Sequence, residues 1–110
     1  MNRANTAKLE RAGWKLGTAK EFLGLTEEEA ALIEIKLALA RGIKERRLAL
    51  RLTQEDLAKQ LRSSQSRVAK MEASDATVSM DFLVRSLLVL GATTQEVGRV
   101  IARSSAAPAA

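Results

Sequence analysis

A group of polar side chains in residues 65–70 carries hydrogen-bonding chemistry that suits the edges of nucleic-acid bases. Gln65 can pair in a bidentate manner with adenine, Lys70 can donate to O6 and N7 of guanine, and Ser66 can bond to either base. On a helix these three positions span little more than one turn, while Val68 and Met71 face inward. The alternative interpretation is an ordinary solvent-exposed helix face, because polar exposed faces are common.

The residue types exclude several other kinds of chemistry. The chain has no histidine and no cysteine, so it cannot form a His-based catalytic triad or a disulfide framework, and it lacks the usual zinc ligands. It also has no glycine-rich phosphate loop and no pair of carboxylates beside a segment expected to form a pocket. We therefore expect no enzyme activity, no catalytic residues, no metal site and no cofactor.

The composition predicts one small helical domain. Of the 110 residues 46% are hydrophobic, but only one is tryptophan and two are phenylalanine, so the core must be aliphatic. Glycine and proline are too scarce for an all-β fold, which needs a turn every ~8–12 residues. No apolar run could span a membrane and no signal peptide is evident, so we expect a cytoplasmic protein. The net charge of +5 suits an anionic partner such as nucleic acid.

Capping patterns divide the chain into five predicted helices. Thr26 and Glu29 form a capping box for a long helix at 27–50, whose two apolar stripes indicate burial on more than one side or contact with another chain. The four other helices are expected at 54–61, 65–73, 80–90 and 93–102.

These helices imply a division of the chain into three parts. Residues 1–25 form an N-terminal extension, residues 26–103 the helical domain, and residues 104–110 a tail of small residues that we expect to be disordered. Trp14 and Phe22 in the extension are expected to pack against the long helix. No internal repeat is visible.

The helices at 54–61 and 65–73 are separated by only three residues, which is the geometry of a helix-turn-helix. In that geometry the second helix enters the major groove of DNA with its N-terminal residues at base edges. Ala58 is small where the two helices cross, and Val68 fills the space between them. We therefore expect residues 53–73 to form a DNA-binding motif.

Residues 52–58 (LTQEDLA) and 64–72 (SQSRVAKME) resemble the Cro/C1-type (XRE) helix-turn-helix family of phage repressors, and the similarity covers residues 36–101. The resemblance implies an all-α, lambda-repressor-like five-helix DNA-binding domain, here with an N-terminal extension and a long first helix. More narrowly, the extension with its long helix resembles HigA-type antitoxins, which are regulators encoded beside RelE-like toxins.

The resemblance also implies roles for single residues at the DNA. Gln65, Ser66 and Lys70 fall where family members read base edges, and Arg67 lies one residue further round, where it could reach a base or a phosphate. Gln54 matches a glutamine that binds a phosphate and braces the second helix of the motif. Ser64, which caps that helix, is grouped with the phosphate-binding residues.

Four further residues are assigned by the same resemblance. Arg47 and Glu72 match an ion pair that ties the first helix of the family to the end of the recognition helix, and we expect this pair to be at least partly buried. Arg51 and Arg62 stand where glycine is usual, each just past a helix end. A non-glycine residue in the left-handed region costs about 1–2 kcal/mol. Either these two turns take another shape or the strain is offset, and phosphate contact is one way to offset it.

Three functions remain open from the sequence. The first is a repressor that binds an inverted-repeat operator in double-stranded DNA as a homodimer. The second is an antitoxin that acts mainly by binding a RelE-like toxin, with Trp14 and Phe22 as candidate contacts, and the third is a stand-alone phage-type repressor. The apolar residues of 80–102 are most simply core, but the same segment is where family members often dimerise. The dimer interface is therefore assigned to Phe82, Leu83, Leu87, Val97, Val100 and Ile101.

Overall fold

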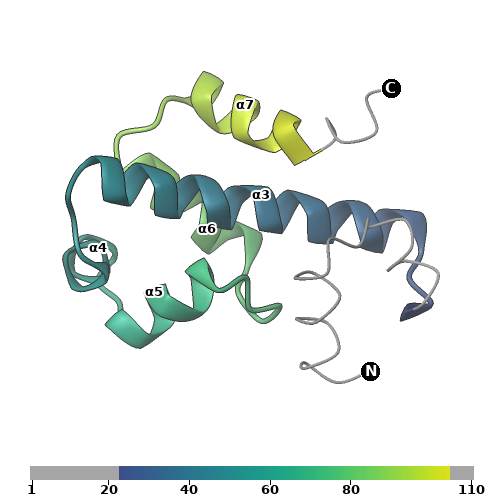
Figure 1. Ribbon diagram of the computed structural model, residues 1–110, viewed down its shortest axis with the longest axis horizontal. Helices are drawn as coiled ribbons and strands as arrows, with labels where there is room; N and C mark the ends of the chain where they lie inside the picture. The colour runs from purple at the N-terminus through teal and green to yellow at the C-terminus, as the bar shows by residue number, and fades with distance from the viewer. Residues whose placement is uncertain (1–22, 105–110) are drawn as a thin grey trace. The chain divides into compact units, whose positions relative to one another are not determined.

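The computed structural model describes residues 23–104 of the chain. The expectations for Trp14, for Phe22 and for residues 105–110 lie outside the described residues. Within them the protein is all α-helical, with five helices and no strand (Figure 1). The helices are α3 (Glu27–Ala49), α4 (Gln54–Leu61), α5 (Gln65–Glu72), α6 (Met80–Val89) and α7 (Thr94–Ser104). Every predicted helix is present, and Ser104, which was expected in the tail, is instead the last residue of α7.

The chain divides into two compact units, residues 1–34 and 35–110, and the boundary falls inside α3. In the first unit α3 begins with the predicted capping box. The Thr26 amide donates to Glu29 Oε1 at 2.9 Å, and the Glu29 amide donates to Thr26 Oγ1 at 3.1 Å. The hydrogen bond from the Thr26 amide is the main cause that holds the pKa of Glu29 below its ordinary value.

The second unit has an aliphatic core to which α3, α4, α5, α6 and α7 all contribute. Ala58 of α4 and Val68 of α5 are both buried in this core, and the two helices contact each other. The largest fully buried apolar side chains are Leu39, Ile43, Leu57, Leu61, Val68, Met71 and Leu87. The described part of the chain contains no helix long and apolar enough to cross a membrane.

The structure corrects the assignment of the dimer interface. Four of its six residues belong to the core of the single chain, because α6 packs against both α4 and α7. Phe82, Leu83, Leu87 and Val97 are only 6, 2, 1 and 8% exposed. Surface that is already buried within one chain cannot be buried again by a partner. Val100 and Ile101 are half-buried at the edge of the same core.

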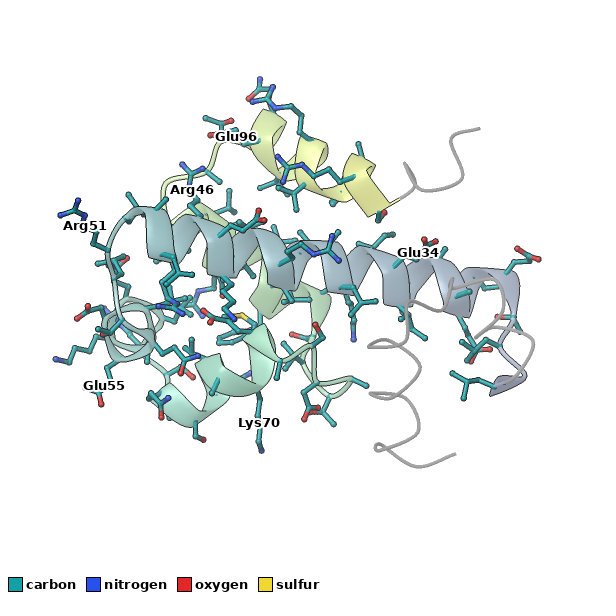
Figure 2. The ribbon with its side chains drawn as sticks, in the orientation of Figure 1. Glu34, Arg46, Arg51, Glu55, Lys70 and Glu96 are labelled. Atoms are coloured by element: carbon teal, nitrogen blue, oxygen red, sulfur yellow. The ribbon has the colours of Figure 1, made fainter. Side chains whose placement is uncertain are left out.

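Helix α7 lies very close to α3. A Cβ atom on Gly42 of α3 would lie only 3.0 Å from Val100 Cγ1, so glycine permits this approach. Arg46 reinforces it by donating from Nε to the Leu90 carbonyl at 3.0 Å and from Nη1 to Glu96 Oε2 at 3.2 Å. Both Arg46 and Glu96 are labelled in Figure 2. The C-terminal half of α3 therefore contacts α7 on one side, while its other sides are free to support the motif.

Candidate nucleic-acid interface

Local capping defines the two helices of the motif. At the start of α4 the Thr53 amide donates to Asp56 Oδ2 at 2.8 Å, and the Asp56 amide donates to Thr53 Oγ1 at 3.0 Å. The hydrogen bond from the Thr53 amide is the main reason that the pKa of Asp56 is lowered. At the start of α5 the Arg67 amide donates to Ser64 Oγ at 3.2 Å. The hydroxyl of Ser64, which was grouped with the phosphate-binding residues, is therefore engaged as a helix cap.

The two arginines at glycine-like positions adopt the glycine-like conformation. The φ angles of Arg51 and Arg62 are 59° and 54°, both in the left-handed region. Because residues 62–64 keep this tight shape, α4 and α5 meet as in a helix-turn-helix, with the Ser63 amide donating to the Ala58 carbonyl at 2.8 Å. Of the two alternatives left by the sequence, the turns therefore keep their shape, and the strain must be offset elsewhere.

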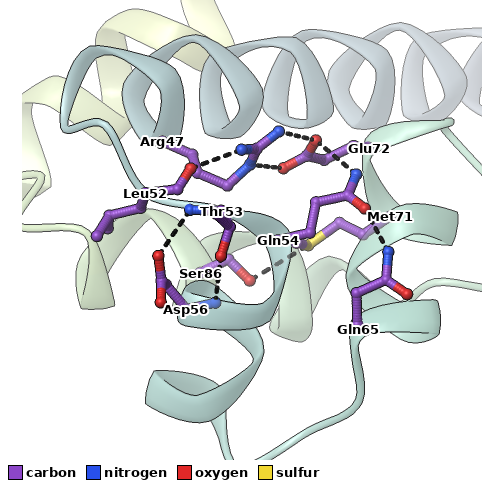
Figure 3. A network of polar contacts seen from close by, with 9 residues as sticks. All are labelled: Arg47, Leu52, Thr53, Gln54, Asp56, Gln65, Met71, Glu72 and Ser86. Atoms are coloured by element: carbon purple, nitrogen blue, oxygen red, sulfur yellow. Dashed lines mark hydrogen bonds and ion pairs between the residues drawn. The ribbon is translucent and has the colours of Figure 1, made fainter.

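A buried ion pair holds the end of α5 against α3. Arg47 donates from Nε to Glu72 Oε2 at 2.6 Å and from Nη2 to Glu72 Oε1 at 2.9 Å (Figure 3). The two side chains are only 8 and 4% exposed. Nη1 of Arg47 also donates to the Leu52 carbonyl at 2.7 Å, which secures the turn before α4. One guanidinium thus joins α3, the α3–α4 turn and α5.

Gln54 extends this network to the start of α5. Its Nε2 donates to Glu72 Oε1 at 3.2 Å, and its Oε1 accepts from Gln65 Nε2 at 2.6 Å (Figure 3). Gln54 therefore bridges the two ends of α5, which is the bracing geometry that the family resemblance implied for this position. Gln65, expected as a base reader, is hydrogen-bonded to Gln54 at the edge of the helix face.

Opposing effects act on the charge of Glu72. Burial is the largest and favours the neutral acid, but the hydrogen bonds from Arg47 and Gln54, with the charges of Arg47 and Lys44, outweigh it. The pKa of Glu72 is therefore lowered, and the pKa of Arg47 is raised mainly by its hydrogen bonds to Glu72. The pair stays ionised at neutral pH, so the network keeps its full set of charge-assisted hydrogen bonds.

The exposed face of α5 is centred on Ser66 and Lys70. At about 100° per residue, these two positions lie only about 40° apart around the helix, and both are exposed. Val68 and Met71 are fully buried on the opposite side. In Figure 2 the Lys70 side chain points away from the neighbouring helices. These two side chains are therefore best placed to reach base edges.

Ala69 also borders this face and was not identified from the sequence. It is half-buried and lies about 60° around α5 from Ser66. An alanine methyl can contact the methyl group of thymine, so a residue without polar atoms can still take part in base recognition. The helical spacing alone could have identified it.

Arg67 lies to one side of the exposed face. Its guanidinium carbon sits 4.3 Å from the centroid of the Phe82 ring on α6. Positions 65 and 67 are about 200° apart around α5, so Gln65 and Arg67 flank Ser66 on opposite sides. Of the two roles left open for Arg67, this position favours a phosphate contact over a base contact.

On the Gln65 side, a cleft of about 680 Å³ lies beside the first turn of α4. Arg51, Thr53, Gln54 and Gln65 contribute to its lining, together with one carboxylate, Glu55. Amide groups at a helix N-terminus and a nearby arginine both favour a phosphate. The structure thus brings Arg51 and Gln54 of the expected phosphate set together, whereas Arg62 lies in a different cleft.

A comparison with models of known protein families places this helix-turn-helix in a family. A family model described as helix-turn-helix matches residues 43–97, which is half of the chain and covers the last seven residues of α3, all of α4, α5 and α6, and the first turn of α7. No curated protein and no solved structure matches. In residues 23–104 no group of carboxylates is arranged to hold a metal ion.

Proposed function

Because the chain belongs to the Cro/C1-type helix-turn-helix family and is a DNA-binding transcription regulator, we propose that it is a repressor that binds an inverted-repeat operator as a homodimer. Bases would be read by Ser66 and Lys70 at the centre of the exposed face of α5, with Gln65 at its edge. Arg51 and Gln54 would hold a backbone phosphate in the cleft beside α4. In this proposal Ser64 acts by capping α5 rather than by contacting DNA.

The observation that carries the proposal is the network that connects Arg47, Glu72, Gln54 and Gln65. It fixes α5 at both ends, so the base-reading side chains start from a rigid helix. Preorganised recognition lowers the entropy lost on binding, which favours selective contacts over loose electrostatic attraction. An ordinary solvent-exposed helix would need no such support.

Selection of duplexes from a random pool tests the sequence-reading part of this proposal. We expect the full chain to enrich one sequence with dyad symmetry, and each mismatch in it to weaken binding by about 1–3 kcal/mol. If repeated selection leaves the pool unenriched while the protein still binds it, the protein is not a sequence-specific regulator.

The homodimer rests on a separate argument. A single domain of this size contacts few base pairs, and dimers of this class extend recognition to two half-sites about one helical turn apart. Val100 and Ile101 are half-buried and Leu88 is 45% exposed, so α6 and α7 retain apolar surface for a partner. Light scattering at micromolar concentration should give twice the chain mass of 11.9 kDa. A monomeric mass in free and DNA-bound protein would contradict the dimer.

An antitoxin role is the second candidate. The family match begins only at residue 43, so the N-terminal part of α3 and the residues before it are additional to the matched domain. In this proposal that added part binds a RelE-like toxin, while the motif represses the shared operon. Co-expression with the product of the adjacent gene should give a stable complex. If the two proteins purify separately, the stand-alone repressor is the better description.

A further inference from the structure

Three arginines from different elements line a second cleft, of about 220 Å³, next to α5. Arg62 comes from the turn between α4 and α5, Arg67 from the first turn of α5, and Arg85 from α6. The hydroxyl-bearing residues Ser63 and Ser79 also line it. Arg85 belongs neither to the exposed face of α5 nor to the cleft beside α4.

The charge of this cleft is largely uncompensated. All three arginines are exposed, and none of them forms an ion pair with another of the described residues. Asp81 is the one carboxylate in the lining, so the cleft carries a local surplus of positive charge. Guanidinium groups brought together in this way repel one another, and an anion between them removes the repulsion.

Arg67 is held in place for such an anion. Its guanidinium lies over the ring of Phe82, which is itself only 6% exposed and therefore fixed in the core. A cation–π contact of this kind restricts the side chain while leaving its N–H groups available as donors. The backbone of Arg62 is held in the left-handed conformation, which fixes the point from which its exposed side chain extends.

The position of the cleft relative to α5 indicates which kind of anion it would meet. Arg67 and Gln65 lie about 200° apart around α5, so their two clefts flank the exposed face on opposite sides. A helix with its side chains is about 10–12 Å wide and nearly fills the major groove, which is about 12 Å wide and bordered by one phosphate backbone on each side. If Ser66 and Lys70 face the bases, each cleft faces one backbone.

We propose that the cleft formed by Arg62, Arg67 and Arg85 binds phosphodiester groups of the DNA strand on the Arg67 side of α5. This inference rests on the proposed function. It makes Arg85, outside the two helices of the motif, a DNA-contacting residue. It also makes Arg67 a phosphate ligand that Phe82 positions. The helix α5 is then held between two backbones rather than against one.

Replacement of Arg85 by Gln tests the inference on a duplex of random sequence, so no operator is needed. Each backbone phosphate neutralised contributes about 0.9 to the slope of log affinity against log salt. We expect Arg85→Gln to lower that slope by up to about 0.9. The ratio of the wild-type affinity to the Arg85→Gln affinity should then fall about three- to four-fold between about 50 and 200 mM salt.

Arg99→Gln is the matched control. Arg99 is also exposed and has no ion-pair partner within residues 23–104, but it lies on α7 and lines the cleft against α3. Arg99→Gln should leave the salt slope close to the wild-type value. Arg85→Lys, which keeps the positive charge, should retain most of the wild-type slope. If Arg85→Gln and Arg99→Gln have the same slope while the wild type binds, this inference is wrong and the proposed function stands. If the wild type binds no duplex, the proposed function itself fails.

Inorganic phosphate distinguishes a free phosphorylated ligand from the DNA backbone. At matched ionic strength we expect calorimetry to detect no saturable binding of inorganic phosphate to the DNA-free protein. Saturable binding that Arg85→Gln abolishes, together with an unchanged salt slope on DNA, would assign the cleft to a small phosphorylated molecule and overturn the inference.

Discussion

Arg62 combines a strained backbone with an exposed charge beside the motif. Its φ angle of 54° would suit glycine, and for an arginine the left-handed conformation costs about 1–2 kcal/mol. Strained residues of this kind persist where the surrounding structure holds them, and they gather at functional sites. Here the neighbouring Arg67 and Arg85 supply a functional reason, because all three side chains line one cleft.

Arg62→Gly should therefore separate stability from DNA binding. We expect the free energy of unfolding to rise by up to about 1 kcal/mol, since the relief of strain exceeds the added freedom of glycine in the unfolded chain. Affinity for any duplex should fall, because a phosphate-binding cation is lost. Denaturant unfolding and duplex titration measure the two effects, with Arg62→Ala as the control that loses the charge and keeps the strain. A glycine variant that binds DNA as tightly as the wild type would contradict the assigned role.

Glu72 makes the stability of the motif depend on pH. Its pKa is lowered in the folded chain, so the ionised pair with Arg47 contributes stability that is fully present above the ordinary glutamate pKa of about 4.5. That contribution is lost as the pH falls through the lower, folded pKa. Replacing one partner of a buried pair costs about 3–5 kcal/mol at neutral pH. For Glu72→Gln we expect the lower part of that range, because the amide oxygen still accepts from Arg47.

Unfolding of the wild type and of Glu72→Gln at several pH values checks this expectation. The stability difference between the two proteins should narrow as the solution is acidified below about pH 4. If the difference in the free energy of unfolding stays constant down to the lowest pH measured, the charge of Glu72 does not stabilise the fold.

At the scale of the helices, the N-terminal ends were predictable from local chemistry. Thr53 with Asp56 and Ser64 with the Arg67 amide satisfy orphan amide groups within three residues, so a short stretch of sequence contains all the information needed. The shape of the turns at Arg51 and Arg62 was not predictable in this way. Local preference disfavours arginine there, but the packing of α4 against α5 holds the turn at Arg62, and the hydrogen bond from Arg47 to the Leu52 carbonyl holds the turn at Arg51.

The contact between α3 and α7 yields a prediction about two glycines. Both Gly42 and Gly98 lie inside helices, where alanine is favoured over glycine by about 0.5–1 kcal/mol. Nothing lies within 4 Å of a Cβ atom added to Gly98, so Gly98→Ala should raise the free energy of unfolding by that amount. Gly42→Ala should raise the free energy of unfolding by less, because the added Cβ would lie 3.0 Å from Val100 Cγ1. If thermal or denaturant unfolding shows the same increase in the free energy of unfolding for both variants, α7 does not pack so closely against α3.

For the molecule as a whole, the sequence predicted the fold class and the arrangement of the motif, and the all-α fold of the described residues confirms the class. The sequence could not tell whether an apolar residue is buried within one chain or between two, which is why Phe82, Leu83, Leu87 and Val97 were assigned to an interface. The proximity of Arg67, Phe82 and Arg85 was equally hidden, because it arises only when α6 packs beside the turn of the motif.

In the proposed complex the exposed face of α5 reads base sequence while flanking residues hold phosphates. Lys70→Ala tests it most directly, in titrations on the selected duplex and on a shuffled duplex of equal length, with Lys59→Ala on α4 as the control for loss of one charge. We expect Lys70→Ala to weaken binding to the selected duplex by about 1–3 kcal/mol, with a much smaller loss on the shuffled one. Equal losses on both duplexes would contradict it, because Lys70 would then act only through its charge.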